Sequence, residues 1–181
     1  MSGSRKGLVH RSLGIGGFTL IELLIVIGVL GILASIILVA VDPAKRLRQS
    51  RDARRASEVN GILNAILNYT ADNKGALPAQ LAAATSTTDF YMLGTCTSGA
   101  GGPDVCNAGW LNPVCVDMKT DTSLVDTYIA DMPIDPRGSH ATSTFPYNAS
   151  MTGYYVGKSS NGRITVGSCN PEDVSSISVK R

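Results

Sequence analysis

The hydrophobic pattern begins with an apolar run close to the start of the chain. Over residues 18–41 the only charged side chain is Glu22, and after Leu23 the only polar one is Ser35. About 20 apolar residues, at roughly 1.5 Å per residue, cross a bilayer core of roughly 30 Å. The run therefore predicts a helix of membrane-spanning length.

A second apolar pattern, with a helical period, follows Pro43. Apolar or small side chains recur at intervals of three and four through residues 44–73, at Leu47, Ala53, Ala56, Val59, Ile62, Leu63, Ile66, Leu67 and Tyr69 or Thr70. This spacing predicts an amphipathic helix that ends before Gly75 and Pro78. Pro43 must either kink the preceding helix or start a new one, and the sequence leaves both possibilities open.

Strand patterns lie near the end of the chain. Residues 153–157 and 163–167 are rich in β-branched and aromatic side chains, and the Asn161-Gly162 pair between them predicts a hairpin. Residues 114–118 and 177–179 are further strand candidates, and residues 123–129 predict a short helix. We therefore expect an α+β fold, in which a long N-terminal helical spine packs against a small antiparallel β-sheet head.

Composition and charge refine this division. The chain has 181 residues, of which 44% are hydrophobic and 17% charged, and this balance argues against disorder throughout. The net charge of +2 hides a basic leader, residues 1–17, that carries Arg5, Lys6 and Arg11 and no acid. We expect four segments: the leader 1–17, the apolar helix 18–41, an amphipathic stem 42–74 and a globular head 75–181.

The stem opens with a basic cluster. Over eleven residues, six cations face one carboxylate, Asp52; the cations are Lys45, Arg46, Arg48, Arg51, Arg54 and Arg55. Three interpretations are open: a solvated face that packs against acidic neighbours, contact with anionic lipid head groups, or nucleic-acid binding. The head, from residue 76 onward, has nine acids against six bases, so its charge is opposite to that of the stem.

The residues around Glu22 carry a more specific signal. An ordinary signal peptide fits poorly, because its apolar segment is only about 7–15 residues long. The sequence Gly-Gly-Phe-Thr-Leu-Ile-Glu-Leu-Leu-Ile-Val over residues 16–26 resembles the class III signal of type IV prepilins and pseudopilins. That signal is a short basic leader ending in Gly, followed by an apolar residue, usually Phe, then Thr-Leu-Ile-Glu and a long apolar helix. The resemblance is strong over residues 1–78.

This resemblance implies a processing site and an assembly site. A membrane-embedded prepilin peptidase would cut between Gly17 and Phe18 and N-methylate Phe18. The new ammonium group of Phe18 and the carboxylate of Glu22 could then pair between neighbouring subunits and neutralise each other in a helical stack. The implied partners are further copies of the chain, the peptidase, and an inner-membrane assembly platform with its ATPase. The implied location is the cytoplasmic membrane first and an extracellular filament afterwards.

Helix-weakening residues punctuate the spine. Gly28 and Gly31 interrupt the aliphatic run, and each costs roughly 1 kcal/mol relative to Ala in a helix. We expect local flexibility at these two glycines and at Pro43, or ordinary close packing against lipid or a neighbouring helix.

All four cysteines lie in the predicted head, at Cys96, Cys106, Cys115 and Cys169. In an exported head they predict disulfides, for which three pairings exist. We favour Cys96 with Cys106, closing a Gly-rich loop, and Cys115 with Cys169, tying a middle strand to the final hairpin.

Nothing in the sequence predicts catalysis or a cofactor. The only histidine of the head is His140, and no nucleophile triad, phosphate-binding glycine loop or zinc spacing occurs. Asp131 and Asp135 faintly resemble a loop that in some major pseudopilins helps bind calcium. We therefore expect a structural subunit of a type IV pilus-like filament. The alternatives are a type II secretion pseudopilin, a competence pilin that binds DNA, and a signal-anchored domain that is not cleaved.

Overall fold

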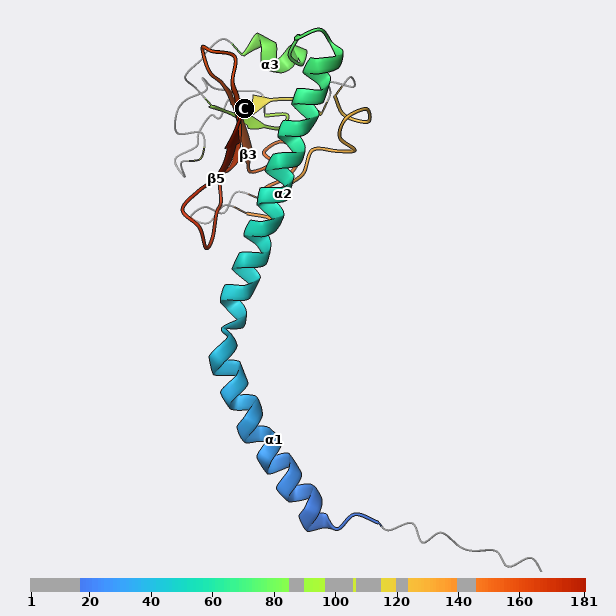
Figure 1. Cartoon of the computed structure of the whole chain (residues 1–181), viewed down its shortest axis with the longest axis vertical. Coiled ribbons are helices and arrows are strands. Elements are labelled where there is room, and N and C mark those ends of the chain that lie inside the picture. The colour runs from blue at the N-terminus through green and yellow to red at the C-terminus, as the bar shows by residue number, and fades with distance from the viewer. Residues whose placement is uncertain (1–16, 85–89, 97–105, 107–114, 120–123, 140–145) are drawn as a thin grey trace, which may run out of the picture. The chain divides into compact units, whose positions relative to one another are not determined.

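The computed structural model describes residues 17–84, 90–96, 106, 115–119, 124–139 and 146–181 (Figure 1). The chain divides into two compact units, Met1–Pro43 and Ala44–Arg181. The helix of the first unit is α1, Leu20–Val41, which confirms the predicted apolar helix. Asp42 ends α1 in a left-handed conformation with φ 40°, and a new helix begins at Pro43. The alternatives left open at Pro43 are thereby resolved as two helices.

The second unit is built on α2, Pro43–Asp72, which matches the predicted amphipathic helix closely. Its last turn closes with the amide of Gly75 bonded to the carbonyl oxygen of Thr70 at 2.8 Å. A short helix, α3, follows at Ala79–Ala83. Leu81 of α3 is fully buried, so this turn of helix closes one end of the core.

Five strands form one sheet in the order β2-β1-β3-β4-β5. Their bounds are Phe90–Leu93 for β1, Cys115–Val116 for β2, Tyr154–Lys158 for β3, Ile164–Ser168 for β4 and Ile177–Lys180 for β5. The predicted hairpin is confirmed as β3 and β4, one residue later than expected. β5 pairs with β4 in antiparallel register, and Val166 lies opposite Val179.

The fold class is confirmed as α+β, with one difference in the sheet. We expected an antiparallel sheet, whereas β1 and β2 pair in parallel, with Met92 opposite Cys115. A long connection separates these two strands in sequence, and parallel neighbours require such a connection. β1 itself was not predicted, because four apolar residues before a glycine are too short a run to identify a strand.

The hydrophobic core lies between α2 and one face of the sheet. Alternate residues of each strand point toward α2, as a period of two requires, and this face carries Tyr91, Leu93, Tyr154, Val156, Ile164, Val166 and Ile177. The upper half of α2 contributes Val59, Ile62, Leu63, Ala65 and Ile66. The two layers lie side by side in Figure 1. The apolar face predicted from the spacing is correct for this half of the helix.

The lower half of α2 corrects the predicted stripe. Leu47 and Ala53 were expected to face the core, but both are exposed, and Asp52 and Arg55 are buried instead. The reason is that the lower half of α2 packs on polar loops through ion pairs and not on the sheet.

A second correction concerns residues 123–129. Their described part, from Leu124 onward, is a set of turns around Asp126, whose φ is +70°, and not a helix.

The backbone is closely packed at Gly94, the residue that follows β1. Gly94 follows β1 with φ +151°, and a Cβ placed there would lie 2.2 Å from the backbone oxygen of Ser150. We expect Gly94→Ala to lower the free energy of unfolding by about 2 kcal/mol or more, because backbone must move. Gly61→Ala is the matched control, since Gly61 lies in α2, where a Cβ would meet no side chain within 4 Å. It should stabilise by about 0.5–1 kcal/mol. Urea unfolding of the full chain in detergent measures both, and similar effects would contradict this account.

Candidate functional site

The predicted processing junction lies immediately before α1. Gly17 and Phe18 are exposed, Phe18 to 89% of its surface. No atom lies within 4 Å of a Cβ placed on Gly17. A peptidase could therefore approach the Gly17–Phe18 bond without displacing other described parts of the chain. The cations of the leader, Arg5, Lys6 and Arg11, lie outside the described residues.

Glu22 is held at the start of α1 by a capping box. Thr19 has an extended backbone, and its hydroxyl oxygen accepts a hydrogen bond from the amide of Glu22 at 3.3 Å. In return, the Glu22 carboxylate accepts from the Thr19 amide at 3.1 Å and from its hydroxyl at 3.0 Å. The Thr-x-x-Glu spacing is the sequence signature of this motif, and our reading of the sequence missed it. The carboxylate is thereby directed back toward the residue next to Phe18.

The apolar surface of α1 is exposed in the described part of its unit. Its large aliphatic side chains from Leu20 to Leu38 are each between 51% and 82% exposed. The segment Leu20–Leu38 has a mean hydropathy of 2.8, and its length is sufficient to cross a membrane. Gly28 and Gly31 lie inside this continuous helix with no atom near a Cβ placed on either. Flexibility at the two glycines stays a prediction.

A buried ion network is the main polar feature of the second unit. Arg55 is fully buried, and its guanidinium donates two hydrogen bonds of 2.8 Å to the two carboxylate oxygens of Asp135. It donates further bonds to Asp52 at 2.8 Å and to Glu172 at 3.0 Å. Arg51 donates to both oxygens of Glu172, at 2.5 and 2.9 Å. Three carboxylates from α2, the 131–138 loop and the segment after β4 thus surround one arginine.

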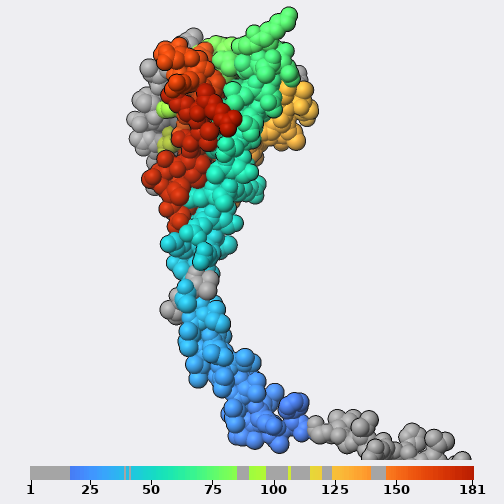
Figure 2. Space-filling model, viewed as in Figure 1, coloured from blue at the N-terminus to red at the C-terminus, as the bar shows by residue number. Residues whose placement is uncertain are grey.

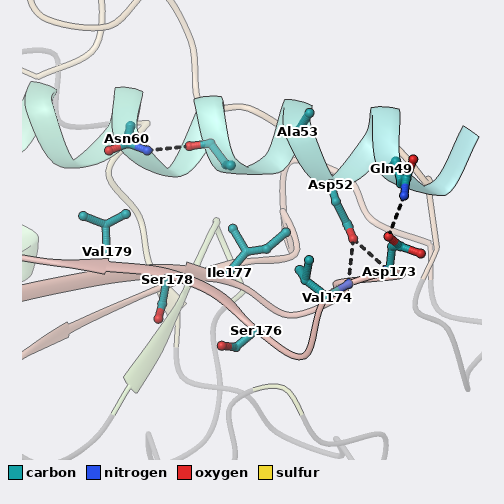
Figure 3. Close-up of a pocket in the computed structure, with 11 residues that line it drawn as sticks. Gln49, Asp52, Ala53, Asn60, Asp173, Val174, Ser176, Ile177, Ser178 and Val179 are labelled. Atoms are coloured by element: carbon teal, nitrogen blue, oxygen red, sulfur yellow. Dashed lines mark hydrogen bonds between the residues drawn. The ribbon is translucent and has the colours of Figure 1, made fainter. Parts of the chain in front are cut away.

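Asp52 ties the segment after β4 to α2 in another way. Its carboxylate accepts from the backbone amides of Glu172, Asp173 and Val174, at distances between 2.7 and 3.3 Å. Figure 3 shows this carboxylate aimed at the chain that leads into β5, with Gln49 bonded to Asp173 beside it at 3.0 Å. The chain from Glu172 into β5 therefore lies against α2 (Figure 2).

The surroundings of these groups shift their pKa values. Hydrogen bonds from Arg51, and then from Arg55, outweigh burial and lower the pKa of Glu172 to about 2. Burial would raise the pKa of Asp52, but the amides of Asp173 and Glu172 and the Arg55 guanidinium together lower it. Burial would likewise lower the pKa of Arg55, but the carboxylates of Asp135, Glu172 and Asp52 raise it. All these groups are charged at neutral pH.

The network reduces the number of unpaired cations in the basic cluster of the stem. Arg51 and Arg55 pair within the network, and Arg54 pairs with Glu58 at 2.8 Å. Three of the six cations that the sequence placed together are thus neutralised by carboxylates of the folded chain. Sequence reasoning missed this, because Asp135 and Glu172 lie 80 and 117 residues from Arg55.

The two aspartates singled out as possible calcium ligands each pair with a cation of the chain. Asp131 lies 2.9 Å from the ammonium of Lys119, and Asp135 binds Arg55. Within the described residues, no group of three or more His, Cys, Asp or Glu side chains is arranged to hold a metal ion. His140 lies outside the described residues.

The four cysteines form two disulfides, but not the pairs that we favoured. Cys96 pairs with Cys115 and Cys106 pairs with Cys169, with Cα–Cα distances of 5.3 and 5.0 Å. The parallel pairing of β1 with β2 brings Cys115 beside the chain that leaves β1, and this excludes a Cys115–Cys169 bridge. The amide of Cys96 donates a hydrogen bond to the carbonyl oxygen of Ser150 at 3.2 Å.

Comparison with known families supports the N-terminal site. Residues 14–38 match the family described as the prokaryotic N-terminal methylation motif. This is the class III prepilin signal of type IV pilins and pseudopilins, so the predicted recognition is confirmed. No curated protein and no solved structure is significantly similar to the chain. The motif indicates a pilin-like or pseudopilin substrate of prepilin peptidase and points to a structural protein, with membrane insertion followed by filament formation.

The buried arginine gives a direct test of the network. We expect Arg55→Met to lower the free energy of unfolding by about 3–5 kcal/mol, because it removes the buried cation that the carboxylate of Asp135 pairs with. Arg54→Met removes a cation one residue away, whose side chain is 63% exposed, and should cost under about 1 kcal/mol. Urea unfolding in detergent compares the two. Equal losses of unfolding free energy in the two variants would contradict a stabilising role for the buried network.

The lowered pKa of Glu172 predicts acid sensitivity. Its folded pKa, about 2, lies below its ordinary value of 4.5, so the stability it contributes is complete above the ordinary value. That contribution declines as the pH falls below 4.5 and is exhausted below about 2. We expect Glu172→Gln to be less stable than the parent at neutral pH and to lose less stability on acidification. Thermal unfolding across this pH range measures the difference, and parallel curves for the two proteins would contradict it.

Proposed function

We propose that the chain is the precursor of a structural subunit of a type IV pilus-like filament. Prepilin peptidase removes residues 1–17 and N-methylates Phe18, residues 18–41 form the membrane anchor and later the filament core, residues 42–74 form the stem and residues 75–181 the extracytoplasmic head. The observation that carries the proposal is the methylation motif at residues 14–38 on a helix whose apolar surface is bare.

The bare surface of α1 explains why the chain would polymerise. A helix with this much exposed apolar surface is stable only in a bilayer or against other apolar helices. Extraction from the membrane therefore has to be coupled to burial of α1 among copies of itself. In the implied machinery, an assembly platform and a cytoplasmic ATPase supply the work of extraction.

Glu22 supplies specificity to this step. Cleavage creates an ammonium at Phe18, and both that cation and the Glu22 carboxylate are costly to bury alone. A pair formed between neighbouring subunits neutralises both charges and fixes the axial step of the stack. Within the precursor, the carboxylate binds Thr19, so it is already oriented at the end of the helix where the new ammonium appears.

The first experiment is the intact mass of the protein recovered from cells that carry its own prepilin peptidase. We expect the loss of residues 1–17 and the gain of one methyl group. A full-length mass would overturn the proposal and leave a signal-anchored domain. Subunits recovered from a surface fibre support a pilus. Periplasmic retention, with a requirement for calcium, would instead identify a type II secretion pseudopilin, and DNA affinity of the exported form a competence pilin.

Two variants separate the charge of Glu22 from its capping role. Glu22→Gln keeps a side-chain acceptor for the capping box but removes the charge, so we expect normal cleavage and a loss of filaments of at least about tenfold. Thr19→Ala removes the hydroxyl cap and keeps the charge, at a cost of about 1 kcal/mol in helix stability, and should still assemble. Sheared filament yield, relative to processed subunit in the membrane, measures both. Normal assembly of Glu22→Gln would overturn the intermolecular pair.

A further inference from the structure

Five of the six cations at the start of the stem, the arginines, fall into two groups in the folded chain. Arg51, Arg54 and Arg55 each have a carboxylate within hydrogen-bonding distance. Arg46 and Arg48 differ, because no salt bridge joins either of them to a carboxylate in the described part of the chain. Arg46 has only a long, 3.5 Å hydrogen bond to the neutral amide of Gln49.

An apolar side chain lies exposed between these two arginines. Leu47 is 61% exposed. It is the only large aliphatic side chain of α2, all of whose residues the structure describes, that is exposed. Residues 43–47, the first turn of α2, are exposed, whereas Arg48 is half-buried. Residues 45–48, Lys-Arg-Leu-Arg, thus combine three cations with one bare leucine; we call them the basic collar.

The collar also lies at the wrong end of its helix for cations. The amides at a helix N-terminus favour negative charge, yet the first turn of α2 carries no acid and contains Lys45 and Arg46. Asp42, just before the helix, supplies one carboxylate, so residues 42–48 keep a net positive charge. An external anion beside the collar would therefore be stabilised by the helix end as well as by the side chains.

The sequence position of the collar identifies the anion. Arg46 and Arg48 follow the end of the apolar run by five and seven residues. The two steps through Asp42 add at most about 7 Å. The helical rise of about 1.5 Å per residue from Pro43 onward then keeps both within roughly 15 Å of the run. The head-group layers of a bilayer extend several ångströms beyond the hydrocarbon on each side. Arginine and lysine side chains are long enough to reach that layer while an apolar neighbour lies against it.

We propose that the basic collar binds anionic phospholipid head groups on the outer side of the cytoplasmic membrane while the subunit awaits assembly. The proposal rests on membrane insertion of α1, which is part of the proposed function. Phosphate oxygens pair with Arg46 and Arg48, and Leu47 lies against the head-group layer. The contacts are electrostatic and reversible, so extraction can break them. The collar would retain the unassembled subunit at the membrane surface.

The test uses the full chain reconstituted in bilayers of phosphatidylcholine and phosphatidylglycerol. Spin-labelled versions of the two lipids give their relative association constants with the protein. The variant combines Lys45→Gln, Arg46→Gln and Arg48→Gln. Its matched control combines Arg163→Gln, Lys180→Gln and Arg181→Gln, which removes three exposed cations of the head. The leader cations Arg5, Lys6 and Arg11 are common to all three proteins, so only differences between them count.

We expect the parent and the control to prefer phosphatidylglycerol and the collar variant to lose this preference by at least about fivefold, the contribution of one cation near an anionic surface. The preference should also fall with added salt. Equal preferences in parent and collar variant, or an equal loss in the control, would overturn the proposal. Resistance to alkaline extraction is measured in parallel, so failed insertion, which would sink the proposed function, is distinguished from loss of lipid preference. Carbodiimide cross-links from Lys45 to a neighbouring copy in filaments, without lipid preference in bilayers, would assign the collar to subunit contact.

Discussion

A fully buried arginine organises the lower half of the second unit. Taking a guanidinium out of water costs several kcal/mol, and only well-placed carboxylates offset that cost. Arg55 meets this demand with Asp52 from its own helix, Asp135 from a loop and Glu172 from the segment before β5. Each of these charged groups can be buried only because its partners of opposite charge are in place. The ion network therefore sets where two loops lie on α2, in a region where few apolar side chains could do so.

The upper half of the same helix is held by a different kind of interaction. From Val59 to Ile66, α2 packs aliphatic side chains against one face of the sheet, and this contact is non-directional and tolerant of exchange. The disulfide between Cys106 and Cys169 ties the connection between β1 and β2 to the residue that directly follows β4. The ion network, the apolar contact and the disulfides together stabilise a unit whose sheet is small.

The first unit differs from the second, because α1 forms its backbone hydrogen bonds within the helix and leaves its apolar side chains exposed. Its stability therefore depends on what surrounds it, which in the function that we propose is a bilayer before assembly and other copies afterwards. One polar device sits at its end, where Thr19 and Glu22 cap the helix and hold a carboxylate next to the cleavage point. In the function that we propose, the same side chain caps the helix of the precursor and becomes a counter-ion after processing.

The sequence by itself determined the features that depend on neighbouring residues. The apolar length of α1, the Gly17–Phe18 junction, the position of Glu22, the break at Pro43 and the β3–β4 hairpin are local patterns, and such patterns act over a few residues. Only the tertiary structure decided the features that depend on distant residues: the partners of Arg55, the disulfide pairing and the parallel register of β1 with β2. The spacing of residues in the sequence does not predict which of them pair when they lie 60 or more residues apart. Cys106 and Cys169, which form a disulfide across a separation of 63 residues, are an example. For the same reason Asp52 and Arg55, polar in sequence, could be recognised as buried only once their partners had been placed.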